Sequence, residues 1–389
     1  MIDYENFLEA VRKLGMDYNW GRMFAKKFVD DFAAFETTDE QKKWAMERGF
    51  YPGRIELYGL NDDNYKNYLP DWNYFMVHPL NHHFRKWVDD KLTLKYVLDS
   101  GDCIDTMPDY YLYIENDGTY TYLMDAPKNI VKDENFIKNL LEQKGIIMMK
   151  PNSGTSGGRG IIKLELLNGM IYENNKPIDE LRFKDILSHL GNYIVTEYAR
   201  QHSELAAIWG KSECTLRIIM VKTPKDEPYS FSEWSCIVSY ARFGTSVSGG
   251  TSNLSSGGIG VGFDFDTGMY NEFGIRYKKF CEDGVWKLCE HPDTKMVWKN
   301  ARLPNWMLVK KKIGSICNQI SSLDYLGFDI IITEDGMTIC EINTHPACDY
   351  EQVMCGPIFS KENGKKFFGA KGIDQFDTTD LYKAYLTSL

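Results

Sequence analysis

The sequence predicts an α+β protein in which a mainly helical N-terminal region precedes a strand-rich body. Three observations lead to this prediction. Helical patterns cover residues 4 to about 50, short apolar strand-like runs with occasional helices begin near residue 110, and no repeat or low-complexity linker separates the two parts. With 389 residues and 43% hydrophobic content, the chain can bury a sizeable core and suits two or three domain-sized units.

The composition excludes several classes of protein. A net charge of -10 argues against nucleic acid as the main partner, because phosphate backbones need a positive surface. The chain has no run of about 18 apolar residues, and its polar N-terminus does not resemble a signal peptide. We therefore expect no membrane span and a cytoplasmic location. The nine cysteines are dispersed and never form CxxC, so we expect reduced thiols and no zinc site.

The N-terminal helices are predicted from their caps and patterns. Thr38 with Gln41 three residues later resembles a capping box, and Gly49 suits the end of the helix that it opens. The segment 51–87 is aromatic and is expected to be irregular. Residues 90–98 predict another helix.

Apolar, β-rich runs predict seven strands in the body of the chain. Their ranges are 110–114, 119–124, 145–149, 160–166, 193–199, 215–222 and 233–243. Helical patterns recur in three further segments. These are 179–190, 304–323 and 379–388.

A glycine-rich loop follows the predicted strand 145–149. That strand leads into Lys150, and residues 151–160 (PNSGTSGGRG) lead into the next strand. Such a hairpin tip exposes backbone N–H groups that can wrap an anion, and Lys150 adds a fixed positive charge. The spacing fits neither a P-loop nor a Rossmann glycine motif. A flexible surface turn is the alternative interpretation.

The segment 327–343 is predicted to form a hairpin around a Glu-Asp-Gly turn. If the turn centres on Asp335, Asp329 lies opposite Glu341, and Asn343 shares a face with Glu341. Opposed carboxylates destabilise a sheet unless a cation compensates them. Because hard oxygen ligands suit Mg²⁺, we expect Asp329, Glu341 and Asn343 to hold this ion. The alternative is that these are solvated strand residues.

Together, these residues resemble the ATP-grasp superfamily and, within it, the sugar-transfer associated ATP-grasp branch, which is similar to the teichuronopeptide-biosynthesis proteins. The resemblance covers about residues 85 to 355. Four blocks carry it: 150–160, 197–217, 253–266, and 291–306 leading to the hairpin. The resemblance implies an ATP-grasp fold in which two α+β subdomains clasp ATP.

The domain boundaries follow from the positions of these blocks. We expect an N-terminal helical region at 1–90, a lid subdomain with the glycine-rich loop at 91–198, and a catalytic subdomain with the metal hairpin at 199–389. The first 85 residues show no match to the usual Rossmann-like first domain of the family, which leaves the acceptor-binding surface open.

The resemblance also implies roles for particular residues. Lys150 contacts the α and β phosphates, and Lys91 is a second, weaker phosphate candidate. The lid over the nucleotide contains Ser153, Gly154, Thr155, Ser156, Gly157, Gly158 and Gly160. The remaining implied residues are Glu197, Tyr198 and Ala199 for adenine, Glu204 for ribose, Arg217 for the transferred phosphoryl group, Asn253 for phosphate or substrate, and Asp329, Glu341 and Asn343 for metal.

The implied activity is that of an ATP-dependent carboxylate–amine ligase with ATP and Mg²⁺ as cofactors. A carboxylate is activated as an acylphosphate and an amine attacks it, which attaches an amino acid to a cell-surface glycan precursor or peptide. A tubulin-ligase-like peptide modifier, an ATP-dependent phosphotransferase acting on a sugar or lipid, and a nucleotide-binding protein without catalysis are the alternatives. His291 and His345 lie near the site in sequence and suit either substrate contact or a structural role.

Overall fold

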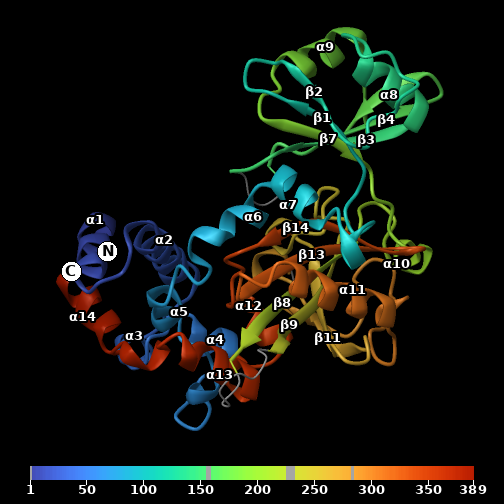
Figure 1. Cartoon of the computed structure of the whole chain (residues 1–389). Helices are drawn as coiled ribbons and strands as arrows, with labels where there is room; N and C mark the ends of the chain where they lie inside the picture. The colour runs from blue at the N-terminus through green and yellow to red at the C-terminus, as the bar shows by residue number, and fades with distance from the viewer. Residues whose placement is uncertain (1, 155–158, 225–232, 282–283) are drawn as a thin grey trace.

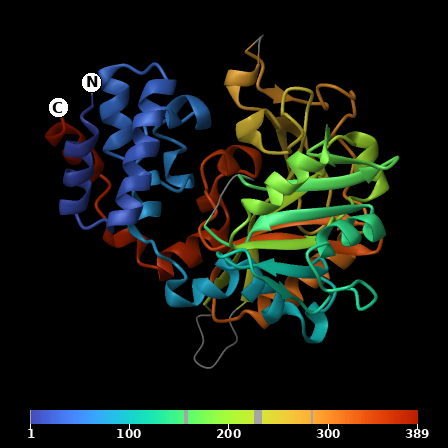
Figure 2. The ribbon, with the colours of Figure 1, turned by 90° about the horizontal axis from the view of Figure 1, so that it is seen from above.

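The computed structural model describes residues 2–154, 159–224, 233–281 and 284–389. Two seven-stranded antiparallel sheets lie one above the other, and a helical layer stands beside the second sheet (Figures 1 and 2). This arrangement confirms the predicted α+β class. In the part of the chain that the structure describes, no helix has the length and apolarity needed to cross a membrane.

The N-terminal layer consists of short and medium helices. They are α1 (Tyr4–Lys13), α2 (Tyr18–Ala34), α3 (Asp39–Met46), α4 (Arg54–Tyr58), α5 (Asp71–Met76) and α6 (Lys86–Asp89). The predicted capping box is present, because Thr38 and Gln41 bond each other's backbone N–H. The segment 51–87 was expected to be irregular, but it contains α4 and α5, which apolar contacts with the other helices stabilise.

The C-terminal segment completes this layer. It contains α12 (Tyr350–Met354), α13 (Glu362–Ala370) and α14 (Asp380–Thr387), and its end lies beside α1 (Figure 1). Tyr385 of α14 packs edge-on against Phe28 of α2, with ring centroids 6.3 Å apart. One core therefore joins the two ends of the chain to strands of the second sheet.

The first sheet has the strand order β2-β1-β7-β3-β4-β5-β6. The strands are β1 (Tyr110–Ile114), β2 (Tyr120–Tyr122), β3 (Ile146–Pro151), β4 (Ile162–Leu167), β5 (Met170–Glu173), β6 (Lys176–Ile178) and β7 (Tyr193–Glu197). Two helices, α8 (Phe136–Lys144) and α9 (Glu180–Ser188), pack in its core. The predicted strands are found, and β5 and β6 are additional.

The second sheet has the order β12-β11-β10-β9-β8-β13-β14. Its strands are β8 (Thr215–Thr223), β9 (Glu233–Phe243), β10 (Ile259–Phe263), β11 (Tyr270–Ile275), β12 (Lys287–Leu288), β13 (Tyr325–Thr333) and β14 (Gly336–Asn343). Its core also takes in apolar residues of α7 (Lys91–Leu98), α10 (Ser203–Ile208) and α11 (Trp306–Gln319). The segment 91–98 was expected to belong to the lid subdomain, but its apolar residues pack with the second sheet. The expected domain boundaries at residues 90 and 198 remain predictions.

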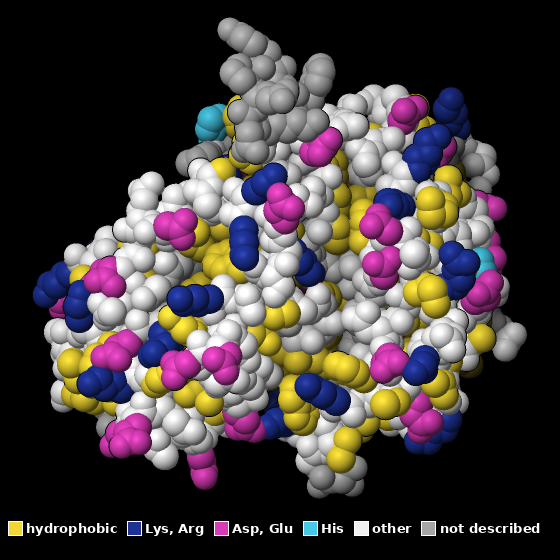
Figure 3. All heavy atoms as spheres, turned by 90° about the horizontal axis from the view of Figure 1, so that it is seen from below, with side chains coloured by type: hydrophobic (Ala, Val, Ile, Leu, Met, Phe, Trp, Pro, Cys, Tyr) yellow, Lys and Arg dark blue, Asp and Glu magenta, His cyan; other side chains and the backbone are white. Residues whose placement is uncertain are grey.

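The surface carries charges of both signs. On the face seen from below, Lys and Arg side chains alternate with Asp and Glu side chains around scattered apolar groups (Figure 3).

Candidate active site

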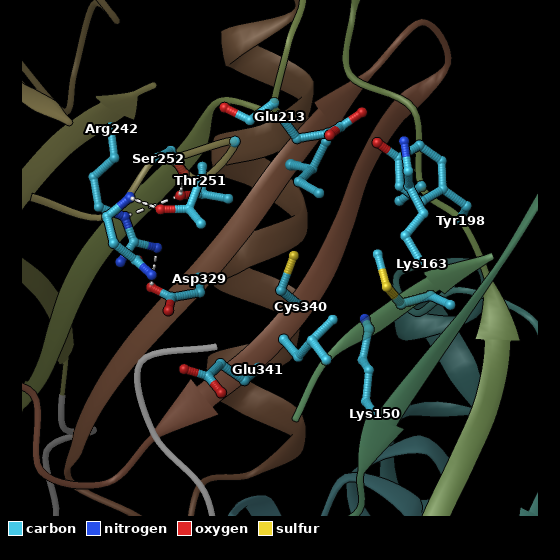
Figure 4. A pocket seen from close by; sticks show the side chains of 18 of the residues that line it. Lys150, Lys163, Tyr198, Glu213, Arg242, Thr251, Ser252, Asp329, Cys340 and Glu341 are labelled. Atoms are coloured by element: carbon cyan, nitrogen blue, oxygen red, sulfur yellow. Dashed lines mark hydrogen bonds and ion pairs between the residues drawn. The ribbon is translucent and has the colours of Figure 1, made fainter. Parts of the chain in front are cut away.

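A cavity of about 530 Å³ lies between the two sheets. The first sheet contributes Lys150 of β3 and Lys163 of β4, whereas the second contributes Asp329 of β13 and Glu341 of β14 (Figure 4). Nine of the predicted site residues line this cavity. They are Lys91, Lys150, Glu197, Tyr198, Ala199, Arg217, Asn253, Asp329 and Glu341.

Two lysines from different elements reach the same part of the cavity. Lys150 lies near the end of β3, which pairs with β4 as the predicted hairpin. Lys91 begins α7 and is 9% exposed. Burial lowers the pKa of Lys91; Glu341 opposes this shift, and Lys150 adds to it. The three charged groups therefore lie close enough to interact.

Asp329 is held by two arginines. Arg217 bonds it with two N–H groups, Nε to Oδ1 at 2.5 Å and Nη2 to Oδ2 at 2.9 Å. Arg242 Nη2 lies 3.1 Å from Oδ1. Burial favours the neutral acid, but the two guanidinium groups outweigh this effect and lower the pKa of Asp329 to about 2. The positive charge that we expected beside Asp329 is therefore supplied in part by Arg217 and Arg242.

The hairpin register matches the prediction through a β-bulge. Near the turn, Ile330 pairs with Ile339, which would place Cys340 opposite Asp329. A register shift between Asp329 and Ile330 makes Cys340 an extra residue, so Asp329 pairs with Glu341. The bulge therefore sets the two carboxylates opposite each other, and Cys340 lines the cavity.

Glu341 and Asn343 are adjacent, as expected. The Asn343 amide donates a hydrogen bond to Glu341 Oε1 at 3.1 Å. Burial and the facing Asp329 carboxylate raise the pKa of Glu341. Two carboxylates and an amide oxygen are a donor set that suits Mg²⁺, which binds through one or two carboxylates and keeps waters. In the described residues no group of three or more His, Cys, Asp or Glu side chains could hold a metal, so amide and phosphate oxygens would complete the shell.

The other end of the cavity suits a nucleoside. The segment after β7 contributes Glu197, Tyr198 and Ala199, and apolar walls come from Met148 and Ile331. Burial and the nearby Glu213 carboxylate raise the pKa of Tyr198. A planar base can therefore lie between apolar side chains while the backbone of 197–199 offers polar groups.

Glu204 does not occupy the expected place. It lies exposed in the first turn of α10 and does not line the cavity. Glu213, which follows α10 in the chain, lines the cavity beside Tyr198 instead (Figure 4). The sequence pattern did not reveal α10, whose first turn holds Glu204 outside the cavity and whose following segment brings Glu213 in.

A loop after β9 forms another wall. Residues 249–253 line the cavity, including the predicted Asn253. The Ser248 hydroxyl donates to Thr251 O at 2.6 Å, and the Thr245 hydroxyl donates to Gly257 O at 2.8 Å. These bonds hold the loop in one conformation, so residues 248–253 (SGGTSN) form an ordered wall of the cavity.

Several predicted residues lie away from the cavity. Ser153, Gly154, Gly160 and Asn343 do not line it, although Asn343 contacts Glu341. Thr155, Ser156, Gly157 and Gly158 lie outside the described residues.

The two histidines are structural in this conformation. His291 is fully buried, and its ring nitrogens contact Gly244 O and the backbone N–H groups of Asp293 and Thr294. The His345 ring packs on Trp20, with centroids 4.6 Å apart. Neither histidine lines the cavity.

The sequence reasoning missed four cavity residues that carry charge, namely Lys163, Lys211, Glu213 and Arg242. The signal for one of them was present. Arg242 lies on β9 opposite Thr215, and its Nε donates to the Thr215 hydroxyl at 2.9 Å. Pairing the two predicted strands 215–222 and 233–243 as a hairpin would have placed Arg242 near Arg217.

Two sheets facing one cavity, one with a lysine-bearing hairpin and the other with a carboxylate hairpin, define the ATP-grasp class of proteins. Within this class the chain belongs to the family described as sugar-transfer associated ATP-grasp, whose model matches residues 77–363. This match confirms the predicted family and its ATP-grasp fold.

Several solved structures are similar to this chain. D-alanyl-alanine synthetase A from Vibrio cholerae shares 12% identity over 74% of this chain and 65% of its own, with a TM-score of 0.40. N5-carboxyaminoimidazole ribonucleotide synthetase from Thermotoga maritima shares 11% over 72% and 49%, with a TM-score of 0.36. D-alanine–D-alanine ligase from Bacillus anthracis, complexed with ATP, shares 13% over 79% and 67%, with a TM-score of 0.35.

These likenesses are too distant to carry an argument about substrate. The chain spans 65% of the length of the first of these proteins and 49% of the second. A comparison with curated proteins finds no match.

Proposed function

We propose that the protein is a carboxylate–amine ligase that forms a C–N bond through an acylphosphate. The carboxylate oxygen of one substrate attacks the γ-phosphorus of ATP, and ADP leaves. The nitrogen of an amine then attacks the acyl carbon, phosphate leaves, and the nitrogen loses a proton. No side-chain nucleophile is required in this scheme.

One observation carries the proposal: Lys150 of the first sheet, Lys91 of α7 and the carboxylates of the second sheet converge on one cavity. Lys91 and Lys150 lie at the same end as Asp329 and Glu341. A triphosphate with Mg²⁺ needs this combination of cations and oxygen ligands. If the glycine-rich loop were only a flexible surface turn, or the 327–343 hairpin only a pair of solvated strands, these lysines and carboxylates would not lie in one cavity.

Each part of the cavity has a task in this proposal. Lys91 and Lys150 bind phosphate oxygens, and Arg217 neutralises charge that develops on the transferred phosphoryl group. The segment 197–199 binds the base, and Glu213 binds the ribose hydroxyls in place of the expected Glu204. Asn253 contacts the phosphate or the acceptor from the loop wall. Enclosure between two sheets excludes water, which protects a reactive acylphosphate from hydrolysis.

Glu341 and Asn343 would hold Mg²⁺, with Asp329 contributing through oxygen lone pairs that the arginines leave. When bound, the ion neutralises phosphate charge and orients the triphosphate. Asp329 also fixes the directions of Arg217 and Arg242, because both guanidinium groups bond it. The Asp329 carboxylate therefore orients the two arginines whether or not Mg²⁺ is bound.

For the substrates, we propose an amino acid as the amine and a cell-surface glycan precursor or peptide as the carboxylate. The family description, which refers to sugar transfer, supports the glycan.

The test is a screen of amino acids together with uronic acids for stimulated ADP release in the presence of Mg²⁺, followed by mass spectrometry of the product. A ligase needs both substrates for full ADP release and yields an amide. Phosphate that remains on a single acceptor would instead identify a phosphotransferase and overturn the proposal. The Glu341→Gln protein is the control, since it should release no ADP above background.

A further inference from the structure

Asn152 lies where the two halves of the phosphate end meet. It follows β3 directly, two positions after Lys150, and is 5% exposed. β3 packs in the core that the first sheet forms with α8 and α9, whereas α7, which begins with Lys91, packs in a different core made mainly by the second sheet. A contact between Asn152 and α7 therefore joins two separate cores.

The polar groups of Asn152 are all bonded. Its carbonyl oxygen accepts a hydrogen bond from Lys91 N at 3.1 Å. Its Oδ1 accepts from Leu92 N at 2.9 Å, and its Nδ2 donates to Asp90 Oδ2 at 2.6 Å. Its backbone N donates to Asn192 O at 2.9 Å. The residue is thus fixed on both sides, by α7 and by the segment before β7.

Asp90 completes this contact, which we call the Asn152–Asp90 interlock. Asp90 is the N-cap residue of α7, and its Oδ1 accepts from Thr93 N at 2.7 Å while its Oδ2 accepts from Asn152. The first three N–H groups of the helix are therefore bonded, those of Lys91 and Leu92 by the distant Asn152 and that of Thr93 by the local cap Asp90. The amide at 152 can only point one way, because its oxygen faces an N–H and its nitrogen faces a carboxylate.

The interlock determines how Lys91 and Lys150 are spaced. Lys91 is the first residue of the helix that Asn152 holds, and Lys150 precedes Asn152 on the same strand. Both ammonium groups line the same cavity, and burial together with the nearby Lys150 lowers the pKa of Lys91. Cations that are already in place lose little freedom when they bind an anion, so a fixed spacing strengthens binding.

We infer that Asn152, acting through Asp90, is a positioning residue that holds Lys91 and Lys150 at the spacing that a nucleoside triphosphate requires. The inference rests on the proposed function, because it takes the polyphosphate of ATP as the ligand of the two lysines. Asn152 itself has no role in the chemistry. An asparagine suits this place because it donates to Asp90 without adding a negative charge beside the phosphates.

The test exchanges the two side chains. Asn152→Asp sets two carboxylates against each other and should weaken ATP binding about ten-fold or more, because an unpaired buried charge breaks the interlock. Asp90→Asn, which adds no charge, should weaken it about three-fold. The double variant restores the hydrogen bond between the two side chains with the donor and acceptor reversed, while Leu92 N and Thr93 N still donate to side-chain oxygens at 152 and 90. Its affinity should therefore return to within about two-fold of the wild type. Calorimetry with ATP and Mg²⁺ measures all four proteins.

Adenosine binding distinguishes the proposed positioning role from a purely structural one, because a structural defect would weaken the binding of adenosine and of ATP alike. Adenosine lacks phosphates, so the variants should bind it as the wild type does. Asp179→Ala is the matched control, because it removes a similar helix cap, that of α9, from the same sheet region and away from the cavity. Its affinity for ATP should not change.

The inference is overturned if the double variant binds ATP no better than Asn152→Asp, or if adenosine and ATP weaken in parallel. Should Asn152→Asp not fold, Asp90→Asn and the double variant give the same comparison, and a double variant weaker than Asp90→Asn overturns the inference. A wild-type protein that binds no ATP would instead overturn the proposed function.

Discussion

Asp329 and Arg217 form a two-bonded ion pair beneath the cavity, with Nε–Oδ1 at 2.5 Å and Nη2–Oδ2 at 2.9 Å. Their side chains are 8% and 14% exposed, so the pair is largely shielded from water. A planar guanidinium that meets a carboxylate with two parallel bonds is held in one orientation. The direction of Arg217 is therefore set before any substrate arrives.

This pair gives the first prediction. Asp329→Asn leaves two buried guanidinium groups without their carboxylate, and we expect unfolding free energy to fall by about 3 kcal/mol. ATP turnover should be lost as well. Urea denaturation measures the first effect, and Asp117→Asn in an exposed turn is the control. An Asp329→Asn protein of unchanged stability would contradict the ion-pair assignment.

Glu341→Gln should separate turnover from stability. Burial and Asp329 already disfavour the charged form of Glu341, so the neutral amide should leave the melting temperature unchanged or slightly higher. Turnover of ATP should nevertheless be abolished, because the metal loses a carboxylate ligand. Thermal denaturation and ADP release measure the two quantities, with the exposed Glu180→Gln as control. Normal turnover in Glu341→Gln would sink the metal assignment.

Lys150→Ala should mainly weaken ATP binding. Loss of a charge-assisted bond to phosphate predicts an affinity reduced about ten-fold or more. Lys91→Ala should have a similar but smaller effect. Lys176→Ala, on the edge strand β6 and away from the cavity, should bind ATP as the wild type does. Calorimetry decides the matter, and equal affinities for Lys150→Ala and Lys176→Ala would contradict the assignment.

Glu213 and Glu204 form a matched pair for testing the ribose contact. Glu213 lines the cavity, whereas Glu204 lies exposed on α10. Glu213→Ala should weaken ATP binding about five-fold through loss of a hydrogen bond to a hydroxyl, and Glu204→Ala should have no effect. The reverse result in an ATP titration would restore the assignment made from sequence resemblance.

A fifth prediction concerns pH. Burial and the Asp349 carboxylate raise the pKa of Glu351 above its usual value of 4.5, and Tyr240 donates to its Oε1 at 3.1 Å. The folded state therefore keeps a proton that the unfolded state releases. This stabilisation is complete below the unfolded pKa and is lost as the pH rises through the folded pKa.

Glu351→Gln mimics the protonated acid, so its stability relative to the wild type should rise between about pH 5 and about pH 9. Melting temperatures of the two proteins across this range measure the effect. A difference that does not change with pH would show that Glu351 ionises normally in the folded protein.

Much of the architecture was predictable because strand pairs and caps leave local signals. The ranges 110–114 and 233–243 match β1 and β9 residue for residue, and the pairing of Asp329 with Glu341 was also predicted. That pairing is correct for an incomplete reason. The hairpin centres between Glu334 and Asp335, half a residue before the assumed centre at Asp335. The bulge at Cys340 compensates for this offset, and the two-residue periodicity of a strand cannot reveal a bulge.

Features that depend on distant contacts could not be predicted. Arg242 reaches Asp329 only because β9 and β13 both border β8, which is a fact of sheet order. Glu213 replaces Glu204 because Glu204 lies in the first turn of α10 and the segment after this helix carries Glu213 to the cavity. Asn152 lies inside the glycine-rich loop motif, but its role depends on a helix 60 residues earlier in the chain. Sequence patterns report neighbours along the chain, and these three cases depend on neighbours in space.

The helical layer, which is built from both ends of the chain, has a consequence for synthesis. Phe7, Phe24 and Phe28 are synthesised long before a part of the core that packs on them, which includes Tyr385 against Phe28. The strands of both sheets can pair before the C-terminal helices are synthesised, and during this time the N-terminal helices expose an aromatic surface. A ribosome that stops before α13 would release a chain with two formed sheets and an open apolar face, which is the kind of product that chaperones and proteases remove.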